Sequence, residues 1–106
     1  GAEYVAKQDK VPFLMNPESP AISALMTAYN DVTGQDAKPF VMKGGTYARL
    51  FSHAVSFGQQ FPDEVKPAWV GGMHGPDEGV SEEGMKRAFR VYVRAIGNLL
   101  ALESLV

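Results

Sequence analysis

The residues best suited to chemistry lie together between positions 73 and 78. His74 is followed by Asp77 and Glu78, so one imidazole and two carboxylates fall within five positions. Imidazole nitrogen and carboxylate oxygen both bind zinc well, and a chain without cysteine must use such groups for any metal. A plainer interpretation stays open, because a loop histidine is more often solvated, and acids before a helix favourably meet its positive dipole end.

A second candidate site is the string Gly44-Gly45-Thr46, which follows a short apolar run. Paired glycines permit positive φ and let backbone N–H groups approach an anionic or polar ligand. A tight turn explains the same residues equally well. The string lacks the further glycines and the lysine of a nucleotide phosphate loop, so nucleotide binding is not indicated.

Two amphipathic helices are expected to position these residues. Ser19 and Pro20 predict a helix start, Gly34 suits its left-handed cap, and the helix should cover 20–33. Ser81 predicts the N-cap of a second, longer helix over 81–104. Each helix carries an apolar stripe at spacings of three and four that should face the core. The two stripes are Ile22, Leu25, Met26, Tyr29 and Val32, and Met85, Ala88, Phe89, Tyr92, Ile96, Leu99 and Leu100.

The segments between the helices predict short strands. Residues 39–42 and 54–57 are apolar runs that end at glycines, and residues 3–8 and 11–15 are weaker extended candidates. Residues 46–50 are expected to form a brief helical turn, and 59–79, rich in Pro and Gly, a long loop. The order predicts an α/β fold in which two amphipathic helices pack on a small sheet.

Composition excludes several classes of partner. The 106 residues carry a net charge of -2 without a basic stripe, so we expect no nucleic-acid or membrane partner. Apolar runs are far shorter than the roughly 20 residues of a membrane span. The absence of cysteine fits a cytoplasmic location. Because the chain starts at Gly1 rather than Met, we expect it to be a piece of a larger protein.

Several short strings occur in a distinctive order. They are Thr33-Gly34, the run from Gly44 to Arg49, the run from Val55 to Gly58, Phe61-Pro62, and His74 with Asp77 and Glu78. In this order the chain resembles the C-terminal end of the PepV-type dipeptidases, in the two-zinc hydrolase superfamily of carnosinase and aminoacylase. The resemblance implies part of a zinc aminopeptidase-like catalytic domain. Residues 1–15 would be the end of a lid domain and its connecting strand, and 16–106 the C-terminal part of the catalytic domain.

The same resemblance implies the roles of individual residues. His74 would be the metal ligand, binding one of two zinc ions, and Glu78 would help to orient His74 without binding the metal itself. Gly44, Gly45 and Thr46 would face the substrate cleft. The upstream ligands and the general-base glutamate of the family are absent, so no catalytic residue is assigned within this segment, and the segment alone should be inactive.

The implied function is therefore hydrolysis of dipeptides by a zinc metallodipeptidase of which this is one segment. Its partners would be the dipeptide and the N-terminal catalytic segment with its lid, and the isolated segment should self-associate through its exposed cleft. Two alternatives stay open. One is a non-catalytic binding or assembly module, and the other is a related N-acyl amino acid deacylase, against which Tyr47-Ala48-Arg49 favours the dipeptidase.

Overall fold

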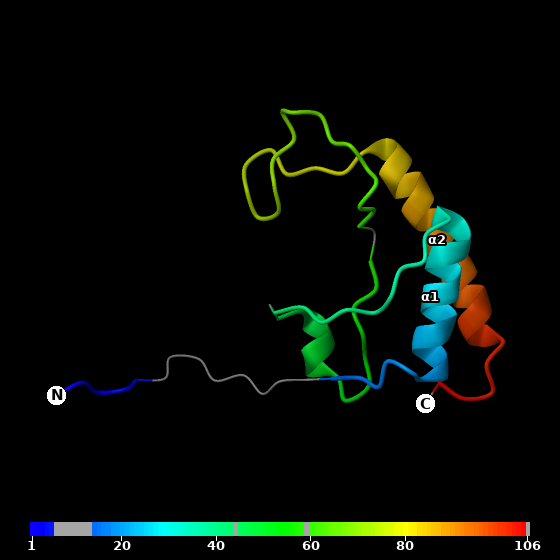
Figure 1. The fold of residues 1–106 in the computed structure, drawn as a ribbon, viewed down its shortest axis with the longest axis horizontal. Coiled ribbons are helices and arrows are strands. Elements are labelled where there is room, and N and C mark those ends of the chain that lie inside the picture. The colour runs from blue at the N-terminus through cyan, green and yellow to red at the C-terminus, as the bar shows by residue number, and fades with distance from the viewer. Residues whose placement is uncertain (6–13, 44, 59, 106) are drawn as a thin grey trace.

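Two antiparallel α-helices pack against each other at one side of the molecule (Figure 1). The computed structural model describes residues 1–5, 14–43, 45–58 and 60–105. The elements are α1 (Pro20–Thr33), the 3-10 turn η1 (Tyr47–Leu50) and α2 (Glu82–Leu100). Figure 1 shows α1 and α2 side by side and running in opposite directions, with η1 and the long connection to one side.

The prediction for the first helix is confirmed at both ends. Pro20 occupies the first turn, where its missing N–H removes no helical hydrogen bond. At the other end Gly34 adopts the left-handed conformation, φ 71°, and its N–H donates to the carbonyl of Asn30 at 2.8 Å. Ser19 stands at the N-cap, but its side chain makes no capping hydrogen bond.

The second helix begins where the sequence predicts and ends earlier. The Ser81 hydroxyl accepts a hydrogen bond from the N–H of Gly84 at 2.8 Å, as an N-cap should. Glu82 and Glu83 lie in the first turn, where the helix dipole favours negative charge. The helix ends at Leu100, four residues before the predicted end at 104.

The prediction of which face of α2 packs on the core is largely wrong. The buried residues of α2 are Gly84, Ala88, Val91 and Ala95. Ala88 and Val91 share a buried cluster with Tyr29 of α1, whereas Gly84 faces Glu64. Small side chains let two helices approach closely. Most of the large apolar residues of the predicted stripe point outward instead, with 68% of Phe89, 58% of Ile96 and 82% of Leu100 exposed.

The predicted sheet is also not found among the described residues. Residues 39–42 and 54–57 run without regular structure, and the described chain holds one isolated parallel bridge, between Gly71 and Glu78. A strand needs a neighbour whose N–H and C=O groups pair with its own, and neither run has one here. The helical turn predicted at 46–50 is confirmed as η1. Residues 6–13, which hold most of the weaker extended candidates, lie outside the described residues.

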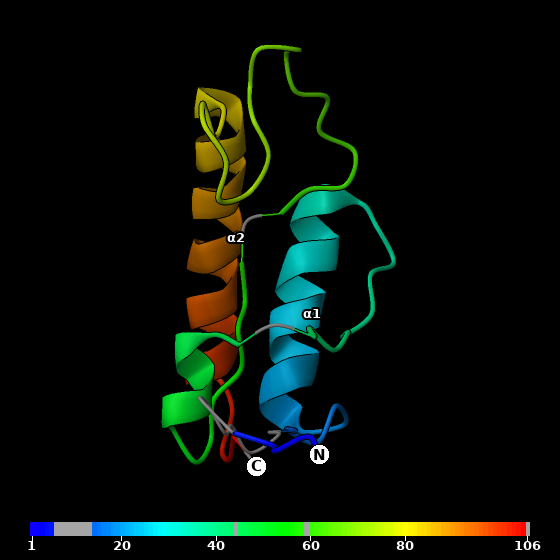
Figure 2. The same ribbon diagram turned by 90° about the vertical axis from the view of Figure 1, so that its left-hand side faces the viewer.

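The molecule is open rather than tightly rounded. Its Cα radius of gyration is 17.1 Å, whereas a compact domain of this length has about 13 Å. Figure 2 shows η1 beside the C-terminal end of α2, while the loop that precedes α2 extends beyond its N-terminal end. No helix within the described ranges is long and apolar enough to cross a membrane.

Candidate metal-binding loop

The predicted ligand His74 lies at the far end of a small closed loop. The N–H of Gly71 donates to the carbonyl of Asp77 at 2.8 Å, and Gly71 and Glu78 form the parallel bridge. Within this closure the N–H of Gly75 donates to the carbonyl of Gly72 at 3.0 Å. The His74 side chain is exposed, so its imidazole is accessible to a ligand from outside the loop.

The backbone of this loop is strained at two positions. His74 and Asp77 have φ values of 61° and 59°, in the left-handed region that costs most side chains about 1–2 kcal/mol. They are the non-glycine residues with positive φ in the described part of the chain. Such conformations persist only where surrounding contacts enforce them, and they concentrate at functional sites. The strain thus singles out the same residues as the sequence.

Gly71 makes the closure possible. A Cβ atom at this position would lie 1.8 Å from the carbonyl oxygen of Pro76, far inside contact distance. Any other residue would push the two sides of the loop apart. Gly72, its neighbour, has no atom within 4 Å of the corresponding point.

Glu78 supports His74 through the backbone. Its carboxylate oxygen Oε2 accepts a hydrogen bond from the N–H of His74 at 3.1 Å. The contact helps to hold the strained turn in place and leaves the imidazole nitrogens of His74 for other partners. This geometry is compatible with the supporting role that the resemblance implies for Glu78.

The described residues do not assemble a complete metal site. Within the described ranges no group of three or more His, Cys, Asp or Glu side chains is placed to hold a metal ion. Zinc in a catalytic site normally takes about three protein ligands and a water. The donor chemistry of His74 fits one such ligand, and a zinc site here would need its other ligands from outside the described residues.

The predicted substrate-binding residues lie apart from His74. Gly44 is outside the described residues, and Gly45 is exposed. Thr46 is the N-cap of η1: its hydroxyl accepts a hydrogen bond from the N–H of Ala48 at 3.3 Å and lies 2.8 Å from the Ser56 hydroxyl. Because η1 lies at the C-terminal end of α2 and the His74 loop at its N-terminal end, the described chain does not bring the two predicted parts together (Figure 2).

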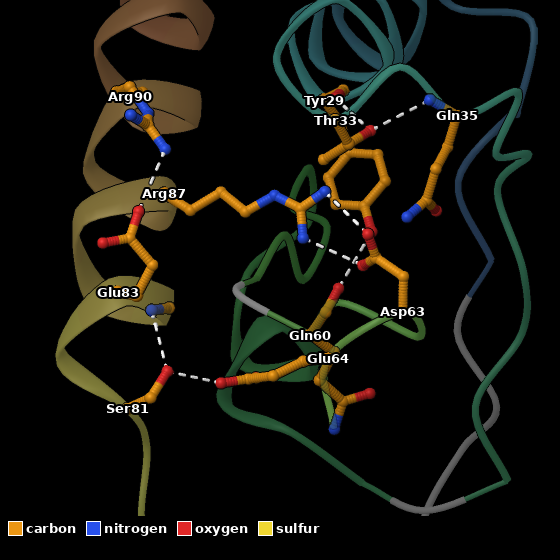
Figure 3. Close-up of polar contacts among 11 residues, drawn as sticks. Tyr29, Thr33, Gln35, Gln60, Asp63, Glu64, Ser81, Glu83, Arg87 and Arg90 are labelled. Carbon is orange, nitrogen blue, oxygen red and sulfur yellow. Dashed lines mark hydrogen bonds and ion pairs between the residues drawn. The ribbon is translucent and has the colours of Figure 1, made fainter. Parts of the chain in front are cut away.

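A polar network at the base of the His74 loop has no counterpart in the sequence analysis. Arg87 of α2 makes a bidentate ion pair with Asp63, at 2.8 and 3.0 Å (Figure 3). Its guanidinium also lies over the Phe61 ring, 4.5 Å from the ring centre. The hydrogen bond from Arg87 holds the pKa of Asp63 below its ordinary range, and the same contact raises the pKa of Arg87. Hydrogen bonds at 24-residue separation leave no pattern in the sequence.

Tyr29 connects this network to α1. Its ring stacks on Phe61 with 5.9 Å between centroids, and its hydroxyl donates to the carbonyl of Gln60 at 2.9 Å. Burial raises the pKa of the Tyr29 hydroxyl, and the nearby Arg87 charge partly opposes that shift. The start of the loop is therefore held on both helices.

Comparison with known proteins gives the family. The family model described as peptidase family M20/M25/M40 matches residues 1–98. The chain belongs to this family. No solved structure shows a significant match to the chain.

Relatives of this M20 chain are named as dipeptidases. It is 28% identical over 96 residues to a "putative dipeptidase" of Staphylococcus saprophyticus, a match covering 91% of the chain and 19% of that protein. It is 30% identical over 103 residues to one from Staphylococcus aureus, covering 97% of the chain and 21% of the relative. A third, from Staphylococcus haemolyticus, is 31% identical over 88 residues, covering 83% and 18%. The chain thus spans about a fifth of the length of these relatives.

Proposed function

We propose that this chain is the C-terminal part of the catalytic domain of a PepV-type, zinc-dependent dipeptidase. The observation that carries the proposal is the match of nearly the whole chain to M20 peptidases and to proteins named as dipeptidases. The open shape of the described chain and its lack of a complete metal site agree with a segment that completes a larger domain. Residues 1–15 would then belong to the exit from a lid domain, and the protein would act in the cytoplasm.

His74 is the residue of this chain that we assign to the metal. The M20 family is generally metal-dependent, and a bound zinc ion supplies Lewis-acid polarisation of a carbonyl and an acidified water. His74 would contribute one neutral imidazole from an exposed, strained and closed loop. The backbone hydrogen bonds of the turn hold the position from which His74 would reach the metal.

Gly45 and Thr46 are assigned to substrate binding and not to the metal. Gly45 is exposed, so its backbone is open to approach by a peptide's polar groups. The Thr46 hydroxyl already caps η1, which makes it a fixed rather than a mobile group. We assign these residues, with Gly44, to holding the dipeptide.

The test replaces His74 in the native protein. His74→Asn removes the imidazole, while asparagine tolerates the left-handed backbone better than alanine does. We expect the variant to lose or weaken one of two bound zinc ions and nearly all dipeptide hydrolysis. The metal-free forms of variant and wild type should unfold at the same midpoint, because losing a bound ligand lowers the apparent stability of the zinc-loaded protein alone. The matched control is His53→Asn, which alters the other, also exposed histidine of the chain.

Metal analysis and hydrolysis of a dipeptide series give the readout. Full activity with both zinc ions retained in His74→Asn would remove His74 from the site. A native protein that holds no zinc and cleaves no dipeptide would favour the non-catalytic module, and cleavage of N-acyl amino acids instead of dipeptides would favour the deacylase.

A further inference from the structure

We propose that Glu64 is a positioning residue for His74. Its contact with Ser81 closes the neck of a loop formed by residues 65–80, and so fixes where His74 lies relative to α2. This inference rests on the proposed function, because it concerns the placement of the metal ligand. Glu64 itself lies at the start of the loop, and nothing in its sequence position relates it to His74.

The loop leaves the helix pair at a firmly held turn. The N–H of Glu64 donates to the carbonyl of Phe61 at 3.0 Å, which closes a turn over residues 61–64. Phe61 is 6% exposed and packs against Tyr29. The bidentate pair of Asp63 with Arg87 holds the same turn on the second turn of α2.

Glu64 joins this turn to the point where the loop returns. Its oxygen Oε1 accepts a hydrogen bond from the Ser81 hydroxyl at 2.5 Å, and that hydroxyl also accepts from the N–H of Gly84 (Figure 3). The Ser81 hydroxyl therefore caps α2 and, through its hydrogen bond to Glu64, closes the neck. A second contact, from Nζ of Lys66 to the carbonyl of Gly79 at 3.4 Å, crosses the neck one step further out.

The closure makes residues 65–80 a compact loop whose two ends meet. Such Ω-loops are held by their own contacts and are frequently functional. Beyond the neck, three backbone hydrogen bonds run within the loop, from the N–H of Val70 to the carbonyl of Pro67, from Gly71 to Asp77 and from Gly75 to Gly72. The loop thus behaves as a unit whose orientation depends on the neck.

Gly84 shows how closely Glu64 approaches the helix. A Cβ atom at position 84 would lie 2.9 Å from Oγ of Ser81 and 3.1 Å from Oε1 of Glu64. Glycine is a poor residue inside a helix, yet its absent side chain leaves the space that the carboxylate and the hydroxyl occupy. The helix, the cap and the neck are therefore built around one contact.

The experiment compares three variants of the native protein. Glu64→Ala removes the acceptor, Glu64→Gln keeps an acceptor oxygen at the same reach, and Glu103→Gln is a charge-matched control at an exposed carboxylate beyond α2. Hydrogen exchange, followed by mass spectrometry, compares residues 65–80 with α1 as the internal reference. Zinc affinity is measured by chelator competition, and kcat and KM are measured separately.

We expect Glu64→Ala to raise exchange in the loop about tenfold without changing α1. It should also weaken zinc binding, by less than the roughly 10- to 100-fold that follows loss of a group bonded to the metal ligand itself, because Glu64 acts on His74 only through the loop. The loss should fall on kcat more than on KM. Glu64→Gln should restore most of both properties, which a loss of general stability would not explain.

Wild-type loop exchange and zinc affinity in Glu64→Ala would overturn the proposal, and so would equal damage in Glu64→Gln. The proposed function fails separately, if the wild-type protein binds no zinc. In that case the exchange measurement still decides whether Glu64 closes the loop.

Discussion

Replacement of Gly71 tests the closed geometry of the His74 loop most directly. A Cβ atom there would lie 1.8 Å from the Pro76 carbonyl oxygen, whereas an ordinary C···O contact is about 3.3 Å. In Gly71→Ala the two sides of the loop, at residues 71 and 76, must separate by about 1.5 Å, the difference between these two distances. The 2.8 Å hydrogen bond from Gly71 to Asp77 would not survive that shift.

The expected cost follows from these losses. A lost hydrogen bond costs about 0.5–1.5 kcal/mol, and residual crowding brings the local total to about 1–3 kcal/mol. The open form of the loop should then be populated about 5- to 150-fold more often. Gly72→Ala is the matched control, because nothing lies within 4 Å of its added Cβ and its φ is outside the left-handed region.

Hydrogen exchange of residues 70–80, together with the zinc content of the native protein, provides the assay. We expect faster exchange and weaker zinc retention in Gly71→Ala, and exchange close to wild type in Gly72→Ala. Equal behaviour of the two variants would refute the closed loop as the reason for glycine at position 71.

Two further predictions concern the ion pair of Asp63 with Arg87 and the exposed apolar side chains of α2. Because Arg87 holds the pKa of Asp63 low, the pair stabilises the protein above about pH 4 and loses that contribution as pH falls through the lowered pKa. Asp63→Asn should therefore unfold at lower urea than wild type at pH 7, and the difference should shrink below pH 4; a constant difference across pH would contradict this. The 106 residues produced alone should self-associate through the exposed side chains of Phe89, Ile96 and Leu100, which sedimentation would detect. Phe89→Glu should reduce the association, and a wild-type monomer at every concentration would count against it.

Local signals in the sequence were sufficient for the helices. Pro20, Gly34 and Ser81 act within their own turns, so their residue types predict helix ends without knowledge of the rest of the chain. The end of α2 was misplaced by four residues because no capping glycine marks it. The turn expected at 46–50 is found as η1 over Tyr47–Leu50.

Predictions that depend on a partner were less successful. A helical stripe of large residues indicates that some surface will cover it, but not that α1 is that surface; α1 instead packs on Ala88, Val91 and Ala95. Likewise the apolar runs at 39–42 and 54–57 indicate strands only if a neighbouring strand is present. Within the described chain, α1 does not cover the large apolar residues of α2, and neither apolar run has a neighbouring strand.

In the candidate site, too, the residue recognised from its sequence neighbours was predicted, and those defined by distant partners were not. His74 was found from its residue type and neighbours, and its strained backbone agrees with that choice. Glu64, Asp63 and Arg87 were missed because their partners lie 17 and 24 residues away, and helical or strand periodicity carries no information at such separations.

The connection between the helices also orders the events of folding. Asn98 of α2 donates to the carbonyl of Ala24, a contact across 74 residues, so pairing of the helices must close most of the chain into one large ring. The closure between Gly71 and Glu78 spans eight residues, and loops of about ten residues close in roughly 10–100 ns. Contacts of long sequence separation slow folding far more than short ones. The turn that presents His74 can therefore form and reform many times before the helices meet, and the hydrogen bond of Ser81 to Glu64 joins it to the helix pair across 17 residues.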